Sequence, residues 1–150
     1  MKTTRIYSMT NNILLFLIGS IMIFSLNSCA TKMPFLSSTI VPGAEGVVKV
    51  NRDKNKNYVI KVQISNLADP SKLQSPKSTY IVWMEGYNNE TKNIGKIKSS
   101  SDLLSKRLKG TLETVSPIKP RKVFISAEND ASIEYANYSD VVLTTDNFKK

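Results

Sequence analysis

The chain has 150 residues, and its 21 lysine and arginine residues against 12 acidic residues give a formal net charge of +9 at pH 7. It contains one cysteine and no histidine, which excludes zinc sites built from cysteine and histidine and catalysis that needs an imidazole base. The length suits one domain with a substantial core, and the positive charge is not accompanied by a nucleic-acid-binding motif, so we exclude nucleic acid as a partner.

The first 28 residues have the three parts of a secretory signal. Lys2 and Arg5 make the start positive, residues 13–26 are apolar, and small residues follow. The apolar run of about 14 residues is shorter than the roughly 20 that a membrane-spanning helix needs. It ends in Leu26-Asn27-Ser28-Cys29, which resembles the lipobox of bacterial lipoproteins. The resemblance implies that Cys29 receives a diacylglyceryl thioether and becomes the first mature residue.

A lipobox further implies where the protein resides. The lipid anchor would bind the protein to a membrane of the bacterial cell envelope. Ala30 follows the cysteine and is not aspartate, which by the rules of the family favours the outer membrane, facing the periplasm. Two other interpretations stay open at this point: an uncleaved N-terminal membrane anchor, and a plain secretory signal cut near Ala30.

Residues 29–42 are small, polar or proline-bearing, which predicts a tether between the lipid and a domain spanning 43–150. Loss of Lys2 and Arg5 with the signal lowers the net charge from +9 to +7. This excess favours anionic surfaces such as phospholipid headgroups or acidic glycans. The lysines are spread over predicted strands and turns, for example Lys49, Lys61 and Lys96, a pattern that a solvated surface without a dedicated partner also shows.

Apolar residues alternate with polar ones in the first half of the predicted domain. A first strand is expected over 44–52, followed by a hairpin turn at 53–57. The next strand, 58–65, has the clearest period of two, with Ile60, Val62 and Ile64 on one face. Residues 66–78, with two prolines, predict a loop.

The segment 79–85 is the most apolar strand and is apolar on both faces, so we expect it to lie centrally and to be covered on both sides. Trp83, the only tryptophan, is expected in the core rather than on a ligand platform. A shorter strand is predicted near 92–98, and residues 99–102 predict a polar break.

Three more strands are predicted before the C-terminus. Residues 104–115 alternate, with Leu108 and Leu112 inward, although Asp102 could instead cap a helical turn over 102–108. The remaining elements are a rigid corner at 116–120, a strand at 122–127, a turn at 128–130, a loop at 131–138 and a last strand at 141–144. The predicted fold class is therefore all-β: an antiparallel immunoglobulin-like β-sandwich of about seven strands after a cleaved signal helix.

Several of these strands together resemble a known family. Residues 80–83, 94–97, 123–128 and 141–143 are similar in order and type to strands of the extracytoplasmic domain of anti-sigma-K factors. The resemblance covers roughly 44–145 and implies the sandwich fold. The chain lacks that family's cytoplasmic sigma-binding domain and its histidine-and-cysteine zinc motif, so it does not imply the regulatory function.

Carboxylates and loop tyrosines are the candidate functional groups. Paired acids among Glu85, Glu113, Glu128, Asp130 and Glu134 would suit a glycosidase or calcium, with 128–130 the closest to a calcium-binding turn. The acids form no dense cluster, so we expect no catalytic residues, no metal and no cofactor. Tyr87, Tyr135 and Tyr138 fall in predicted loops, where they would suit sugar or protein contact, or alternatively packing across the sandwich ends.

The sequence therefore predicts a membrane-anchored, non-enzymatic envelope lipoprotein whose β-sandwich is a binding or scaffolding module. Its expected partner is an envelope protein or an anionic polysaccharide. Two alternatives are a periplasmic signalling accessory related to anti-sigma sensor domains and a carboxylate-dependent enzyme acting on glycans.

Overall fold

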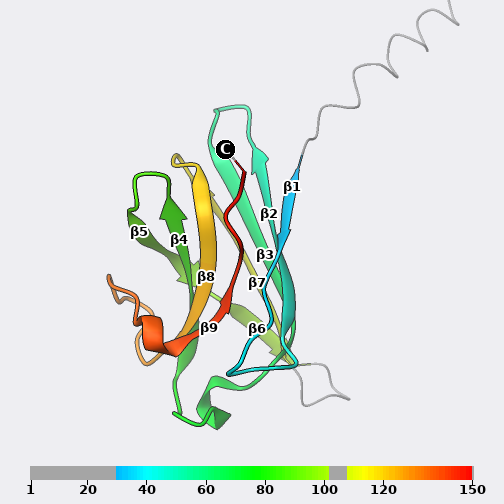
Figure 1. The fold of residues 1–150 in the computed structure, drawn as a ribbon, viewed down its shortest axis with the longest axis vertical. Coiled ribbons are helices and arrows are strands. Elements are labelled where there is room, and N and C mark those ends of the chain that lie inside the picture. The colour runs from blue at the N-terminus through cyan, green and yellow to red at the C-terminus, as the bar shows by residue number, and fades with distance from the viewer. Residues whose placement is uncertain (1–29, 102–107, 150) are drawn as a thin grey trace, which may run out of the picture.

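A computed structural model describes residues 30–101 and 108–149, and these form a β-sandwich without an α-helix (Figure 1). Its nine strands and two short 3₁₀ helices are, in chain order, β1 (Thr31–Pro34), β2 (Glu45–Arg52), β3 (Tyr58–Leu67), η1 (Pro70–Lys72), β4 (Thr79–Gly86), β5 (Thr91–Lys96), β6 (Lys98–Ser101), β7 (Leu108–Ser116), β8 (Pro120–Glu128), η2 (Tyr138–Asp140) and β9 (Val141–Thr144). The predicted fold class, an all-β antiparallel sandwich, is confirmed.

One sheet has five strands in the order β1-β2-β3-β7-β6, all antiparallel. The β2–β3 turn is closed by the Asp53 carboxylate, which accepts a hydrogen bond from the Asn57 backbone N–H at 2.8 Å. In β3 the predicted alternation is confirmed: Ile60, Val62 and Ile64 are buried. Leu108 and Leu112 of β7 pack against the same core, as their spacing predicted.

The second sheet has four strands in the order β5-β4-β8-β9. As predicted, β4 lies inside the sheet and is covered on both faces. Tyr80, Val82 and Met84 face the core between the two sheets, whereas Ile81 and Trp83 belong to a separate cluster on the outer face. Trp83 is fully buried there, so its predicted core role is also confirmed.

Both sides of the sandwich are closed by chain segments that pass from one sheet to the other. After β1, Phe35 bridges to Thr145 and the Leu36 N–H donates to the Thr144 carbonyl at 2.8 Å, which joins the N-terminal segment to β9. On the other side, β5 and β6 belong to different sheets, and the buried Ile97 between them donates to the Tyr80 carbonyl at 3.0 Å. These crossings satisfy backbone groups that open sheet edges would expose.

Two sequence predictions need correction. Residues 29–42 were expected to be a tether, but Thr31–Pro34 pair with β2, and Ser38 and Val41 are buried. The polar break expected at 99–102 is wrong over most of its length, because Lys98–Ser101 form β6 on β7. The two unpredicted strands, β1 and β6, are short edge strands with little apolar patterning, and together they raise the number of strands from about seven to nine.

Some predictions concern residues outside the described part of the chain. These are the signal at 1–28, Cys29, and the choice between strand and helical turn over 102–107. Within the described residues, no helix combines the length and the apolar character needed to cross a membrane.

Candidate functional site

The three candidate tyrosines occupy two different places. Tyr135 and Tyr138 belong to residues 129–140, which we call the covering loop, and 86% and 65% of their surface is exposed. Tyr87 lies in the β4–β5 turn, where its hydroxyl donates to the Phe148 carbonyl and the Lys119 ammonium lies 5.6 Å from its ring centre. Tyr87 therefore packs at the end of the sandwich, and only the other two tyrosines share an exposed segment.

The covering loop lies against the outer face of the four-stranded sheet because that face is apolar. Ile133 and Ala136 pack on the cluster of Ile81, Trp83 and Phe124. The Tyr138 ring stacks on Phe124 with centroids 5.5 Å apart. Two hydrogen bonds from the Asn93 side chain of β5 to loop carbonyls, each 3.0 Å long, hold the first half of the loop.

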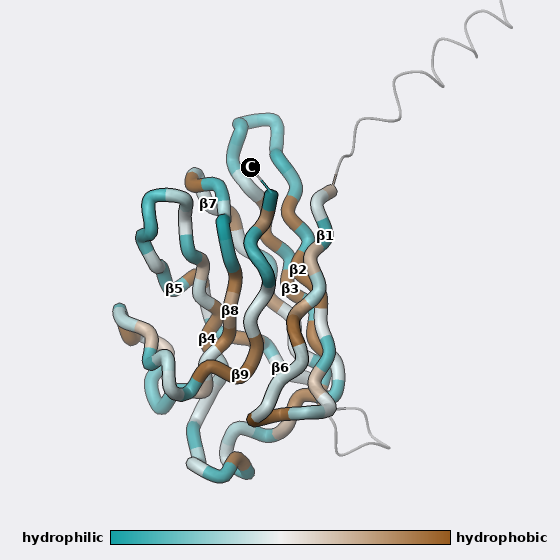
Figure 2. The backbone as a smooth tube through the Cα atoms, viewed as in Figure 1, coloured by the Kyte–Doolittle hydropathy of each residue, from teal (hydrophilic) through white to brown (hydrophobic). Residues whose placement is uncertain are grey.

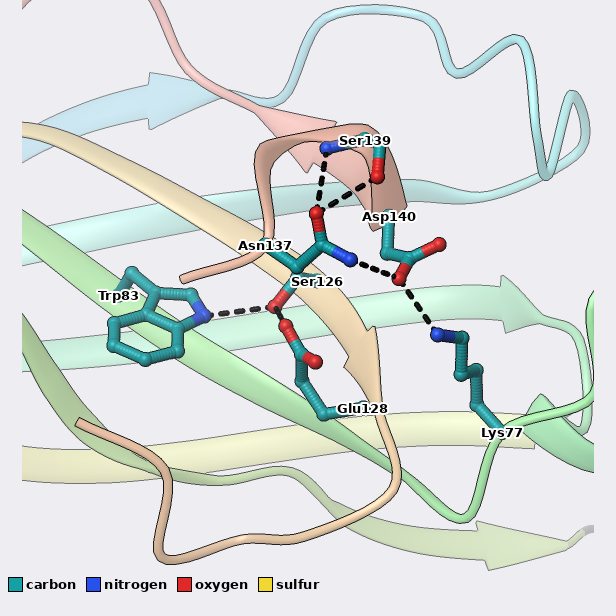
Figure 3. Close-up of polar contacts among 7 residues, drawn as sticks. All are labelled: Lys77, Trp83, Ser126, Glu128, Asn137, Ser139 and Asp140. Atoms are coloured by element: carbon teal, nitrogen blue, oxygen red, sulfur yellow. Dashed lines mark hydrogen bonds and ion pairs between the residues drawn. The ribbon is translucent and has the colours of Figure 1, made fainter. Parts of the chain in front are cut away.

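A buried polar network lies within the same face of the sheet (Figure 3). The Trp83 indole N–H donates to the Ser126 hydroxyl at 2.8 Å, and that hydroxyl donates to the Glu128 carboxylate at 2.5 Å. All three side chains are buried. One serine thus satisfies a donor on β4 and an acceptor at the end of β8, as a hydroxyl can because it both donates and accepts.

An ion pair fastens the other half of the covering loop. The Lys77 ammonium lies 2.6 Å from the Asp140 carboxylate, and only 14% and 19% of the two side chains is exposed. The Asn137 amide donates to the same carboxylate at 2.7 Å and caps η2 by accepting from Ser139 (Figure 3). Beside this pair is a cleft of about 390 Å³, bordered also by Ile40, Leu73 and Val142.

Four of the candidate carboxylates interact with side chains of other types. Glu85 pairs with Arg121, and Glu113 pairs with Lys61. Glu128 turns into the sheet toward Ser126, whereas Asp130 accepts from the Ser132 N–H and hydroxyl at 2.8 Å each, which lowers the pKa of the Asp130 carboxyl. Within the described residues, no three cysteine or acidic side chains lie together as metal ligands.

A second cleft, of about 500 Å³, lies at the end of the sandwich where β1 begins and is lined by positive residues. We call it the basic cleft; its cations are Lys32, Arg52, Lys119 and Lys149. The Asn51 side-chain oxygen at the cleft is buried without a hydrogen-bond partner. An acceptor buried in this way without a donor is unfavourable for the fold.

Sequence reasoning missed the basic cleft because its cations are far apart in the chain. They come from β1, the end of β2, the β7–β8 connection and the C-terminal segment, which the antiparallel topology brings to one end of the molecule (Figure 1). Figure 2 shows this end as strongly hydrophilic at the β2–β3 turn and the C-terminal segment. Two short basic runs, 52–56 and 119–122, were the local signals in the sequence, and each contributes one cation to the cleft.

No protein-family model matches the chain, and no curated protein or solved structure matches it either.

Proposed function

We propose that this chain is a lipid-anchored, non-enzymatic protein of the bacterial cell envelope whose β-sandwich is a binding module. The anchor rests on the sequence Leu26-Asn27-Ser28-Cys29 after an apolar run with a basic start. The acyl chains would contribute about 0.8 kcal/mol per buried methylene, so two or three chains on one cysteine hold a domain almost permanently. Ala30 in place of aspartate favours the outer membrane, facing the periplasm.

The start of the fold supports a defined orientation on that membrane. β1 begins at Thr31, two residues after Cys29, and is hydrogen-bonded to β2. A lipid on Cys29 would therefore hold the end with the basic cleft toward the bilayer. The covering loop and η2 lie toward the other end (Figure 1), where a partner in the periplasm can reach them.

The observation that carries the binding role is the pair of exposed tyrosines on a loop that is already ordered. Tyr138 is held by its stacking on Phe124, and the chain around Tyr135 is fixed by Asn93 and by the Lys77–Asp140 ion pair. An aromatic side chain presented on a fixed loop binds with little loss of conformational entropy. We infer that this loop contacts a neighbouring envelope protein or an anionic polysaccharide.

A photo-crosslinking amino acid at Tyr135 tests the binding role in living cells. The matched control carries the same group at Val115, an exposed apolar residue of β7 that is 56% accessible. We expect specific crosslinked products from position 135 and none of the same mass from position 115. Identical patterns, or no product from position 135, would refute the role of the covering loop. The anchor is tested separately by palmitate labelling, which Cys29→Ala should abolish while leaving the precursor uncut.

A further inference from the structure

The basic cleft gathers positive charges that no described carboxylate balances, although the Arg52 Nε donates to the Lys56 carbonyl at 3.3 Å and the Lys119 ammonium lies over the Tyr87 ring. Its described lining contains four cations and no acidic residue. None of these cations forms an ion pair with a described carboxylate, and three of them, Lys32, Arg52 and Lys149, are exposed. By contrast, Arg121 nearby is neutralised by Glu85. The cleft can therefore attract a negative group.

The position of the cleft indicates where such a group would come from. Thr31 lines the cleft, and two residues of extended chain span at most about 7 Å. A lipid attached at Cys29 would thus hold the headgroup layer close to the end of the domain that carries the cleft, and charges attract one another over a Debye length of about 8 Å at physiological salt. Lysines and arginines close to a membrane are attracted to anionic lipid, whereas the covering loop lies toward the other end of the sandwich (Figure 1).

We propose that the basic cleft binds the headgroups of anionic phospholipids in the leaflet that holds the anchor. This inference rests on the proposed lipid anchor. The phosphate of the headgroup would lie among Lys32, Arg52, Lys119 and Lys149. The contact fixes the tilt of the domain, so that the covering loop is presented at a constant height above the membrane.

Lysine footprinting of the full lipidated protein in vesicles tests this contact. The protein is reconstituted into phosphatidylcholine vesicles with or without phosphatidylglycerol, and its lysines are labelled with a water-soluble acylating reagent. In vesicles that contain the anionic lipid, we expect Lys32, Lys119 and Lys149 to react with the reagent about fivefold more slowly. This factor corresponds to the attraction of about one cation to an anionic membrane. Lys72 and Lys98, exposed and outside the cleft, are the internal controls and should not change.

Two further arms separate the outcomes. Raising salt to roughly 1 M, where the Debye length is about 3 Å, should restore the reactivity of the cleft lysines. In the double variant Lys119→Glu/Lys149→Glu the protection of Lys32 should be lost, whereas Lys72→Glu/Lys98→Glu, with the same change in net charge, should retain it. The lipid and salt experiments use the parent protein, so they test the contact even if a variant does not fold.

Three results would overturn the inference. Equal reactivity in both kinds of vesicle would exclude headgroup binding while leaving the anchor intact. Protection by inorganic phosphate in purely zwitterionic vesicles would show a site for a soluble anion instead. A mature protein with an unmodified Cys29 that does not associate with vesicles would refute the anchor and this contact together.

Discussion

Replacing Ser126 by alanine tests the network that joins the two central strands of the four-stranded sheet. The hydroxyl is fully buried and makes two hydrogen bonds, one from the Trp83 indole and one to the Glu128 carboxylate. Ser126→Ala leaves both partners buried without that bond. Each such group costs about 1–3 kcal/mol, so we expect the free energy of unfolding to fall by about 3 kcal/mol. For a domain of this size the melting temperature should fall by about 10 °C.

Urea unfolding measures this loss in the free energy of unfolding, and it can be followed by the fluorescence of Trp83, which is the only tryptophan and a member of the network. Ser132→Ala is the matched control, because that exposed serine also bonds a carboxylate and should cost less than about 0.5 kcal/mol. In a Trp83→Phe background, where unfolding is followed by far-UV circular dichroism because the tryptophan is gone, the cost of Ser126→Ala should shrink by about 1 kcal/mol, since one of its partners is already absent. A loss for Ser126→Ala below about 0.5 kcal/mol would refute the reasoning.

Three other predictions concern a buried tyrosine, a glycine with positive φ and the ion pair of the covering loop. Burial raises the pKa of Tyr80 to about 12, so as the pH rises this tyrosine loses its proton in the unfolded chain before it does so in the folded one. The contribution of Tyr80 to the free energy of unfolding should be fully present below pH 10 and fall by about 2–3 kcal/mol between pH 10 and 12. Urea titrations at several pH values should show this decline, and Tyr80→Phe should reduce it. Gly95→Ala should cost about 2 kcal/mol in the same titration at pH 7, because Gly95 has φ +133° and a Cβ there would lie 3.1 Å from Leu112; an unchanged midpoint would contradict this. Lys77→Met should cost about 1–2 kcal/mol and speed proteolysis within the covering loop, because Asp140 loses its cation; a protease map identical to that of the parent chain would argue against the fastening role.

The parts of the fold that were predictable are those in which burial controls the pattern. β3 alternates because one face meets the core, and β4 is apolar from Tyr80 to Met84 because both faces are covered. The outer face of β4 is covered by a loop, and the sequence of a loop has no periodic pattern from which this contact could be predicted. β1 escaped prediction because Thr31–Pro34 is an exposed edge strand whose pairing satisfies backbone groups rather than burying side chains.

The candidate site was predictable only where single residues carried the signal. Tyr135 and Tyr138 are exposed loop aromatics, as expected, whereas Tyr87 is tied to the C-terminal segment by a contact 61 residues away. The basic cleft depends on four segments meeting at one end, which only the topology decides. Glu128 was placed in a turn, but it ends β8 and points at Ser126, because a buried serine two residues earlier offers it a donor.

The most direct test of the lipid anchor is the mass of the N-terminal peptide of the mature protein, isolated from membranes. We predict a peptide that begins at Cys29 and carries a diacylglyceryl group on its sulfur, with or without a third acyl chain on its amine. A peptide that begins after Cys29 near Ala30, or a chain that retains residues 1–28 with a free thiol, would contradict the account.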